Sequence, residues 1–339
     1  MSQPLLAIEG LKTHFATDDG WVHAVDGVDL AIERGETLGV VGESGCGKTV
    51  TALTVMKLVA MPPGRIVAGR VLWQGRDLVP LGPDEMRSIR AREIAIVFQE
   101  PMTSLNPVYT VGEQIAEVIR LHQGLGNRAA LEKTVEMLKL VHIPHPERRV
   151  RDYPHQFSGG MRQRVMIAMA LSCWPKLLIA DEPTTALDVT IQAQILELLA
   201  ELKEKFGMAV MLITHAMGVI AEVAERVVVM YLGRADEVAG VRTLFHDPQH
   251  PYTRALLQSI PKVGRRARAR LQPVSGMIPS PYDRPRGCLF HPRCPAVMRG
   301  VCDVSEPPLI SVDPNHRVAC WLYGGQDQHD GAAGDNRAV

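Results

Sequence analysis

The sequence lacks an excess charge of either sign and a long apolar run, and its first residues lack the pattern of a secretion signal. Its 37 basic and 37 acidic residues cancel, so nothing indicates the strongly basic domain of a general nucleic-acid binder. The longest uncharged stretch, 206–221, contains Thr214 and His215 and is shorter than the roughly 20 apolar residues of a membrane-spanning helix. The first residues, MSQPLLAIEG, carry neither the basic start nor the apolar run of a secretion signal, which favours the cytosol.

Internal repeats are also missing, and the composition excludes a chain that is disordered throughout. With 339 residues, 46% of them hydrophobic, the chain can bury a sizeable core and has the length of about two domains.

The apolar pattern predicts an α/β fold with a mostly parallel core sheet. Alternation over 5–41 predicts an N-terminal antiparallel β subdomain. Short apolar runs at 37–41, 94–98, 177–180 and 209–213 predict buried strands that alternate with helices. Between about 100 and 175 the pattern is helical only, with apolar residues at helical spacing over 111–123, 128–140 and 160–173. This predicts an inserted helical subdomain.

A glycine-rich segment follows the first of these buried strands and precedes a helix. Its sequence matches G-x-x-x-x-G-K-[ST] and comprises Gly42, Glu43, Ser44, Gly45, Cys46, Gly47, Lys48 and Thr49. Such a loop turns its backbone N–H groups toward phosphate oxygens, with the lysine on the terminal phosphates and the hydroxyl on magnesium. The spacing is not the G-x-G-x-x-G of dinucleotide binding, so the sequence predicts nucleoside triphosphate binding.

Two adjacent carboxylates, Asp181 and Glu182, follow the apolar strand at 177–180. We expect Asp181 to face magnesium and Glu182 to polarise the attacking water as a general base. Such a pair of carboxylates is by itself also typical of a solvated turn. The presence of the phosphate loop in the same chain is what favours a role in hydrolysis.

The segment from Phe157 to Arg164, FSGGMRQR, resembles the LSGGQ signature of ABC-type ATPases. In that family, residues matching Ser158, Gly159 and Gly160 contact the γ-phosphate held by an opposing subunit. The resemblance also implies that Gln99 contacts magnesium and water, that His215 contacts the γ-phosphate, and that Phe15 stacks on adenine. Ala186, Leu187 and Asp188 match the family's D-loop. An acidic residue commonly follows the histidine, whereas this chain has Ala216.

Longer segments resemble the ATPase subunits of oligopeptide and dipeptide importers, D-subunit type. They are QEPMTSLNPVYTVGEQI, DYPHQFSGGMRQRVMIAMAL, IADEPTTALDVTIQAQI and HPYTRALL, together with a cysteine-bearing tail. The resemblance implies a second ATPase subunit, two membrane permease subunits, an extracytoplasmic solute-binding protein and a place on the cytoplasmic face of the membrane. Two alternatives remain: a soluble ABC-type ATPase of nucleic-acid repair or translation, and a non-catalytic regulatory subunit.

Four of the six cysteines lie close together in a proline-rich segment with little periodicity. They are Cys288, Cys294, Cys302 and Cys320, with five, seven and seventeen residues between them. Four thiolates suit tetrahedral zinc or an iron-sulfur cluster, although structural zinc sites commonly use tighter pairs. Members of the importer family carry a four-iron four-sulfur cluster here, so the resemblance favours that cluster over zinc or plain buried thiols.

These patterns divide the chain into three parts. We expect an ABC nucleotide-binding domain over 1–262, a linker rich in proline and arginine with a four-cysteine metal-binding module over 263–323, and a disordered tail over 324–339.

Overall fold

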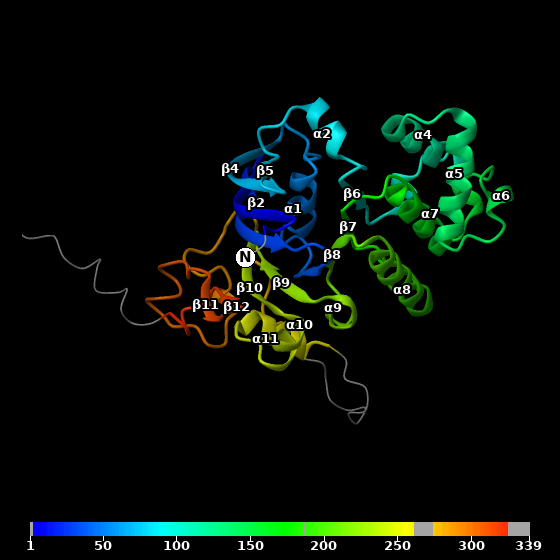
Figure 1. Ribbon diagram of the computed structural model, residues 1–339. Coiled ribbons are helices and arrows are strands. Elements are labelled where there is room, and N and C mark those ends of the chain that lie inside the picture. Colours follow the sequence, from blue (N-terminus) through cyan, green and yellow to red (C-terminus); the bar gives the residue numbers. More distant parts are fainter. Residues whose placement is uncertain (1–2, 186, 261–273, 325–339) are drawn as a thin grey trace, which may run out of the picture.

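The computed structural model describes residues 3–185, 187–260 and 274–324, which form two β-sheets surrounded by helices (Figure 1). The first part of the expected linker and nearly all of the expected tail lie outside these ranges, as does Ala186. Within them, no helix has the length and apolar character needed to cross a membrane.

The N-terminal sheet is antiparallel, with strand order β2-β1-β4-β5. Its members are β1 (Leu6–Thr17), β2 (Gly20–Ile32), β4 (Gly64–Trp73) and β5 (Arg76–Asp77). Along β1, Leu6, Ile8 and Leu11 are buried because one face of the sheet packs on a core. The antiparallel subdomain predicted from the alternating pattern is confirmed.

The core sheet has the order β11-β12-β10-β9-β3-β8-β7-β6. The strands from β9 to β6 run parallel; they are β9 (Arg226–Tyr231), β3 (Thr37–Val41), β8 (Ala209–Thr214), β7 (Leu177–Asp181) and β6 (Ile94–Val97). Cores cover both faces: Leu178 and Ala180 belong to one, and Ile179 belongs to the other. Burial on both sides explains the continuous apolar runs, and the mostly parallel sheet is confirmed.

Six helices lie outside the helical insert among the described residues. They are α1 (Lys48–Val55), α2 (Pro83–Ile89), α8 (Val189–Phe206), α9 (Met217–Val223), α10 (Val241–His246) and α11 (Pro251–Gln258). Asp188 caps α8 by accepting a hydrogen bond from the backbone N–H of Ile191, at 3.0 Å. Gly207, with a φ of 61°, ends the helix.

The helical insert connects β6 to β7 and stands to one side of the core sheet (Figure 1). It comprises α3 (Pro101–Ser104), α4 (Val111–Gln123), α5 (Asn127–Leu140), α6 (Pro146–Arg149), a 3-10 turn (Pro154–Gln156) and α7 (Gly159–Leu171). Thr110 and Glu113 form a capping box that starts α4. The three long helices agree with the predicted ones to within two residues at either end.

The segment 274–324 packs against the far edge of the core sheet. It contains a 3-10 turn (His291–Arg293), β11 (Ile310–Asp313) and β12 (His316–Val318). Because β12 pairs with β10 (Arg234–Gly240), the segment extends the core sheet. The weak periodicity of the sequence gave no sign of these strands, since they are only three and four residues long.

Candidate functional site

The loop over 42–49 joins β3 to α1 and closes around its own lysine. At Gly47, where φ is 100°, a Cβ atom would lie 2.2 Å from the carbonyl oxygen of Ala24, so only glycine fits. Lys48 is buried, and its Nζ donates to the carbonyl oxygens of Gly42 at 2.8 Å and Glu43 at 3.1 Å. A bound phosphate would offer stronger acceptors for the same donor.

The remaining loop residues divide between solvent and the interior. Ser44, Gly45 and Thr49 are exposed, whereas Cys46 is buried. Burial raises the pKa of the Cys46 thiol, so this side chain is a neutral packing group. The exposed backbone of the loop therefore faces the space where an anion would bind.

Asp181, at the end of β7, lies beside the start of α1. Its Oδ1 accepts a hydrogen bond from Thr49 Oγ1 at 3.2 Å, and the residue is 2% exposed. Burial raises the pKa of this carboxyl group above its usual value. The hydroxyl and the carboxylate are hard oxygen ligands of the kind that magnesium prefers, and nearby Lys48 supplies positive charge for the phosphates.

Glu182 is the centre of a hydrogen-bonded cluster. Its Oε2 accepts from Gln99 Nε2 at 3.0 Å and from Thr185 Oγ1 at 2.9 Å, and its Oε1 lies 3.3 Å from His215 Nδ1. Gln99, Glu182 and His215 follow β6, β7 and β8, which are parallel neighbours in the sheet. Their carboxyl ends share one edge, where ligands of open α/β sheets bind.

The helix after His215 begins without an acidic cap. Ala216 occupies the N-cap of α9 and offers no side-chain acceptor. Its own backbone N–H instead donates to Thr214 Oγ1 at 3.0 Å. Thr214 therefore fixes the turn that carries His215, even though the usual acidic residue is missing.

The signature segment lies on the helical insert. Ser158 caps α7 by accepting from the backbone N–H of Met161 at 3.4 Å, and Ser158 and Gly159 are exposed. Gly160 is buried against α8, where a Cβ atom would lie 2.6 Å from Ile191 Cγ2. Figure 1 shows α7 well apart from α1, so the chain does not bring its own signature to its own phosphate loop.

Phe15 lies near the end of β1, beside the β1–β2 turn. It is half-buried, with Val22 and Gly64 as its strand partners. The same hairpin meets the phosphate loop further along, where Ala24 approaches Gly47. The structure thus places Phe15 on an element that contacts the loop.

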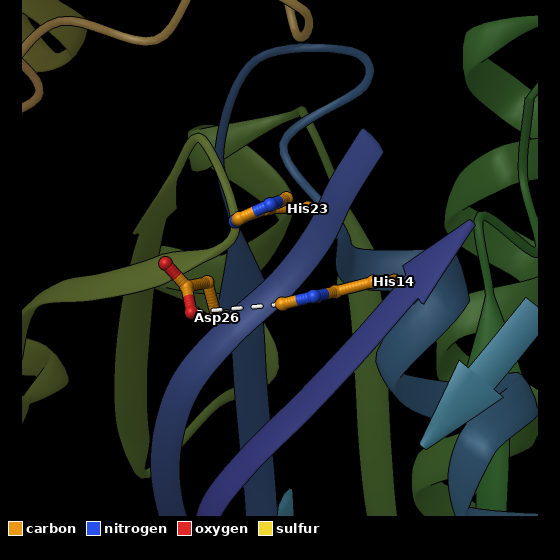
Figure 2. Close-up of side chains that lie close together, drawn as sticks. All are labelled: His14, His23 and Asp26. Carbon is orange, nitrogen blue, oxygen red and sulfur yellow. Dashed lines mark ion pairs between the residues drawn. The ribbon is translucent and has the colours of Figure 1, made fainter. Parts of the chain in front are cut away.

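Next to Phe15, His14, His23 and Asp26 form a compact cluster (Figure 2). The two imidazole rings stack with their centroids 4.0 Å apart. Burial opposes ionisation of Asp26, but three cations outweigh this effect and hold its pKa well below the usual value; they are Lys12, Arg234 and Arg284, at 3.0, 3.2 and 2.9 Å. With its carboxylate already neutralised, the cluster does not suit a metal cation.

The four cysteines of the C-terminal segment lie close enough to influence one another. Burial, with Asp236 and the other thiols adding to it, raises the pKa of Cys288 to about 12 and that of Cys320 to about 11. The Sγ of Cys302 accepts the backbone N–H of Met298 at 3.5 Å, and the backbone N–H groups of Phe290, Ala296 and Leu322 act to lower the pKa of Cys288, Cys294 and Cys320, respectively. Such N–H groups stabilise thiolate ligands of a metal, so the donor set suits a thiolate-bound group.

The cysteine sulfur atoms can be compared with the ligands of a zinc site. Among the described residues, only His14, His23 and Asp26 bring three metal-binding atoms within 4.8 Å of one another. Tetrahedral zinc with bonds of about 2.3 Å would hold its sulfur ligands about 3.8 Å apart. The described residues therefore do not bring three of the four cysteine sulfur atoms as close together as one zinc ion would hold them.

Sequence reasoning missed two residues that contact the phosphate loop. The hydroxyl of Tyr252 accepts the backbone N–H of Glu43 at 2.9 Å, and Arg293 binds the carboxylate of Glu43. Tyr252 lies in the HPYT segment that marked the resemblance, but nothing in the sequence pattern assigned it a contact. Arg293 had no signal apart from its position next to Cys294.

Comparison with protein families gives two matches. Residues 25–185 match the model described as ABC transporter, and residues 237–302 match the model described as oligopeptide/dipeptide transporter, C-terminal region. The second match covers the HPYT segment and three of the four cysteines.

Individual relatives match along almost the whole chain. The sequence is 52% identical to a probable peptide ABC transporter ATP-binding protein of Sinorhizobium fredii, over 94% of both chains. It is 49% identical to the oligopeptide transport ATP-binding protein OppD of Bacillus subtilis, over 94% of this chain and 88% of that one. With the dipeptide transport ATP-binding protein DppD of the same organism, identity is 47% over 98% and 99%.

Solved structures match the cassette. The dimeric, post-hydrolysis structure of an ATP-binding cassette bound to ADP and phosphate has a TM-score of 0.62 and 28% identity, covering 70% of this chain and 99% of that one. The cbiO1 protein of Clostridium perfringens, part of an ABC transporter complex, has a TM-score of 0.61 and 26% identity, covering 73% and 92%.

Proposed function

Since the chain belongs to the peptide-importer branch of the ABC transporter ATP-binding proteins, a family of ATPases, we propose specific roles for its residues in ATP hydrolysis and transport. The observation that carries the proposal is the cluster around Glu182, which joins Gln99 and His215 at one edge of the core sheet. Hydrolysis needs a base beside the attacked phosphate, and Glu182 is the carboxylate with these partners.

The nucleotide roles follow from position around the phosphate loop. Lys48 and the loop N–H groups hold the terminal phosphates, and Phe15 stacks on adenine. Thr49, Asp181 and Gln99 provide the oxygen ligands for magnesium, which neutralises phosphate charge when bound. Glu182 takes the proton of the attacking water, and His215 donates to the γ-phosphate.

A second ATPase subunit completes each site. Ser158, Gly159 and Gly160 stand at the N-terminus of a 13-residue helix, whose exposed N–H groups and dipole favour an anion. Since this segment lies apart from the chain's own phosphate loop, its phosphate belongs to the opposing subunit. We infer a pair of different ATPase chains at the cytoplasmic face of the membrane.

The helical insert carries the surface for the membrane permease. A groove of about 490 Å³ runs beside α4, and its lining residues include Ser104, Tyr109 and Glu117. Tyr109 and its neighbour Val108 are exposed by 53% and 72%. Because the groove follows the loop after Gln99, a permease segment seated there would sense the state of the Glu182 cluster.

Reconstitution tests the transport role. The chain, its partner ATPase and the two permease subunits would be placed in liposomes, and uptake of labelled dipeptides and oligopeptides measured with the solute-binding protein present. We expect ATP-dependent uptake that is lost when Glu182→Gln replaces the wild-type chain. Stimulation of ATP hydrolysis by DNA or ribosomes, without permease association, would instead favour the alternative of a soluble ATPase.

We propose further that Cys288, Cys294, Cys302 and Cys320 hold a four-iron four-sulfur cluster, with zinc as the alternative. The support is the resemblance of this cysteine-bearing segment to importer subunits that carry such a cluster, together with the backbone N–H of Met298 that donates to Cys302 Sγ at 3.5 Å. Protein purified without oxygen should contain about four irons and four acid-labile sulfides per chain. Stoichiometric zinc, or no metal, would overturn this assignment and leave the ATPase site untouched.

A further inference from the structure

Arg293 of the cysteine module is bound to the phosphate loop. Its Nη1 and Nη2 donate to the two carboxylate oxygens of Glu43, at 2.6 and 3.0 Å. The arginine side chain is 3% exposed and that of Glu43 is 22% exposed. A two-pronged, largely desolvated pair of this kind is among the strongest side-chain contacts in proteins, and a lysine could not reproduce its fork.

The other donors of Arg293 are also occupied. Its Nε donates to the carbonyl oxygen of Ser275 at 2.9 Å, and Nη1 also reaches the hydroxyl of Tyr231 at 3.3 Å. Neighbouring Phe290 packs its ring on Tyr231 and Tyr252, with centroids 5.4 and 5.3 Å apart. The guanidinium group is therefore held in one orientation by protein groups.

Glu43 connects this arginine to the lysine of the phosphate loop. Its carbonyl oxygen accepts Lys48 Nζ at 3.1 Å and the backbone N–H of Cys46 at 3.2 Å. Its own N–H donates to the Tyr252 hydroxyl at 2.9 Å. One residue thus joins the cysteine module through its side chain and the phosphate-binding backbone through its main chain.

A negatively charged carboxylate in a phosphate-binding loop opposes nucleotide binding. Nucleoside triphosphates are polyanions, and an unpaired charge on Glu43 would repel them across a partly desolvated loop. Arg293 cancels that charge and fixes the loop conformation at the same time. Arg293 lies between Cys288 and Cys294 in the chain, and the backbone hydrogen bonds His291 N to Cys288 O and Cys294 N to His291 O close this turn.

We propose that Arg293 is a positioning residue for nucleotide binding, and that through its pair with Glu43 the cysteine module sets the affinity of the phosphate loop for ATP. The proposal rests on ATP binding by the loop and does not depend on which metal the cysteines hold. Arg293 acts through Glu43, because its guanidinium group is directed at that carboxylate and at protein oxygens.

The test is a double-mutant cycle read out by nucleotide affinity. Dissociation constants for ATP, ADP and adenosine would be measured on the full chain for Arg293→Gln, Glu43→Gln and the double variant. Arg293→Gln should weaken ATP binding about tenfold, ADP binding less and adenosine binding not at all, because the effect follows ligand charge. Glu43→Gln in the same chain should restore ATP affinity to within about twofold of wild type.

Two further variants separate positioning from general stability. Arg284→Gln removes another arginine by which the module holds the cassette, through its pair with Asp26 at 2.9 Å, and should leave ATP affinity unchanged. Arg293→Lys keeps the charge without the fork and should lose less ATP affinity than Arg293→Gln, because the effect follows charge. Thermal melting of each variant reports stability separately.

Three outcomes would overturn the proposal. The first is wild-type ATP affinity in folded Arg293→Gln. The second is an equal loss for ATP, ADP and adenosine without rescue by Glu43→Gln, which would indicate that Arg293 only supports the fold. The third is an equal loss of ATP affinity in Arg284→Gln.

Discussion

Replacing Glu182 by glutamine should abolish ATP hydrolysis while ATP binding persists. The structure explains why this change isolates the chemistry. The amide oxygen of glutamine can accept from Gln99 and Thr185, as Oε2 does now at 3.0 and 2.9 Å. The amide nitrogen then takes the place of Oε1 beside His215 Nδ1, which accepts its hydrogen bond in the tautomer that carries the proton on Nε2. The cluster keeps its shape and loses only the charge and basicity of the carboxylate.

The expected size of the effect follows from the role of the carboxylate. Removing a positioned general base slows a reaction by about 10²- to 10⁴-fold, which corresponds to about 3–5 kcal/mol of activation free energy. Binding of ATP should change less than about twofold, because Glu182 makes no hydrogen bond to the phosphate loop among the described residues. A single-turnover measurement of phosphate release, with ATP affinity measured separately by fluorescence, distinguishes the two quantities.

A matched control removes a partner of Glu182 and leaves the base in place. Thr185→Val deletes one hydroxyl that donates to Oε2 and should slow hydrolysis by no more than about 30-fold, since the lost contact is worth at most about 2 kcal/mol. Wild-type hydrolysis by Glu182→Gln would refute the assignment of the base. A parallel loss of ATP binding would show that the residue acts on the nucleotide pocket instead.

Three other predictions concern the phosphate loop and the module interface. Lys48→Ala should weaken ATP binding at least about tenfold in a fluorescence titration, and wild-type affinity would contradict the proposed role of the lysine. Glu237→Gln should lower the free energy of unfolding in urea by about 3 kcal/mol. The reason is that the fully buried Glu237 carboxylate accepts hydrogen bonds from two backbone N–H groups and from His316 at 2.7 Å. The control is Glu306→Gln, at an exposed residue, which should change the free energy of unfolding by less than about 0.5 kcal/mol. Burial lowers the pKa of His250 from 6.5 to about 3, so between these pH values the unfolded chain binds a proton that the folded chain does not. The free energy of unfolding should therefore decrease as the pH is lowered across this window, by at most about 1.4 kcal/mol per pH unit. His250→Asn should flatten this slope in urea unfolding curves, and an unchanged slope would contradict the assignment.

Local sequence was sufficient for the phosphate loop and for the type of most elements. The residues from Gly42 to Thr49 are contiguous, so their glycine spacing, lysine and hydroxyl describe a complete anion-binding loop without knowledge of the rest of the chain. Strands buried on both faces must be apolar throughout, and helices of the insert must show a 3.6-residue period. These requirements act residue by residue, and therefore the sequence pattern reveals them.

The meeting of Gln99, Glu182 and His215 depended on tertiary structure. Their separations of 83 and 33 residues are bridged because β6, β7 and β8 are adjacent and parallel, and only the strand order decides which carboxyl ends share an edge. The family resemblance identified the three residues, whereas only the structure shows that the parallel strands bring their side chains within hydrogen-bond distance.

The pair of Glu43 and Arg293, 250 residues apart, had no local signal at all. An arginine beside a cysteine resembles many solvent-exposed arginines until β12 pairs with β10 and the module packs on Tyr231 and Tyr252. The sequence by itself determined that this protein has a phosphate-binding loop and an α/β cassette, because those properties reside in contiguous patterns. Only the tertiary structure decided that the cysteine module binds that loop, because a contact between distant segments exists only once the sheet that joins them has formed.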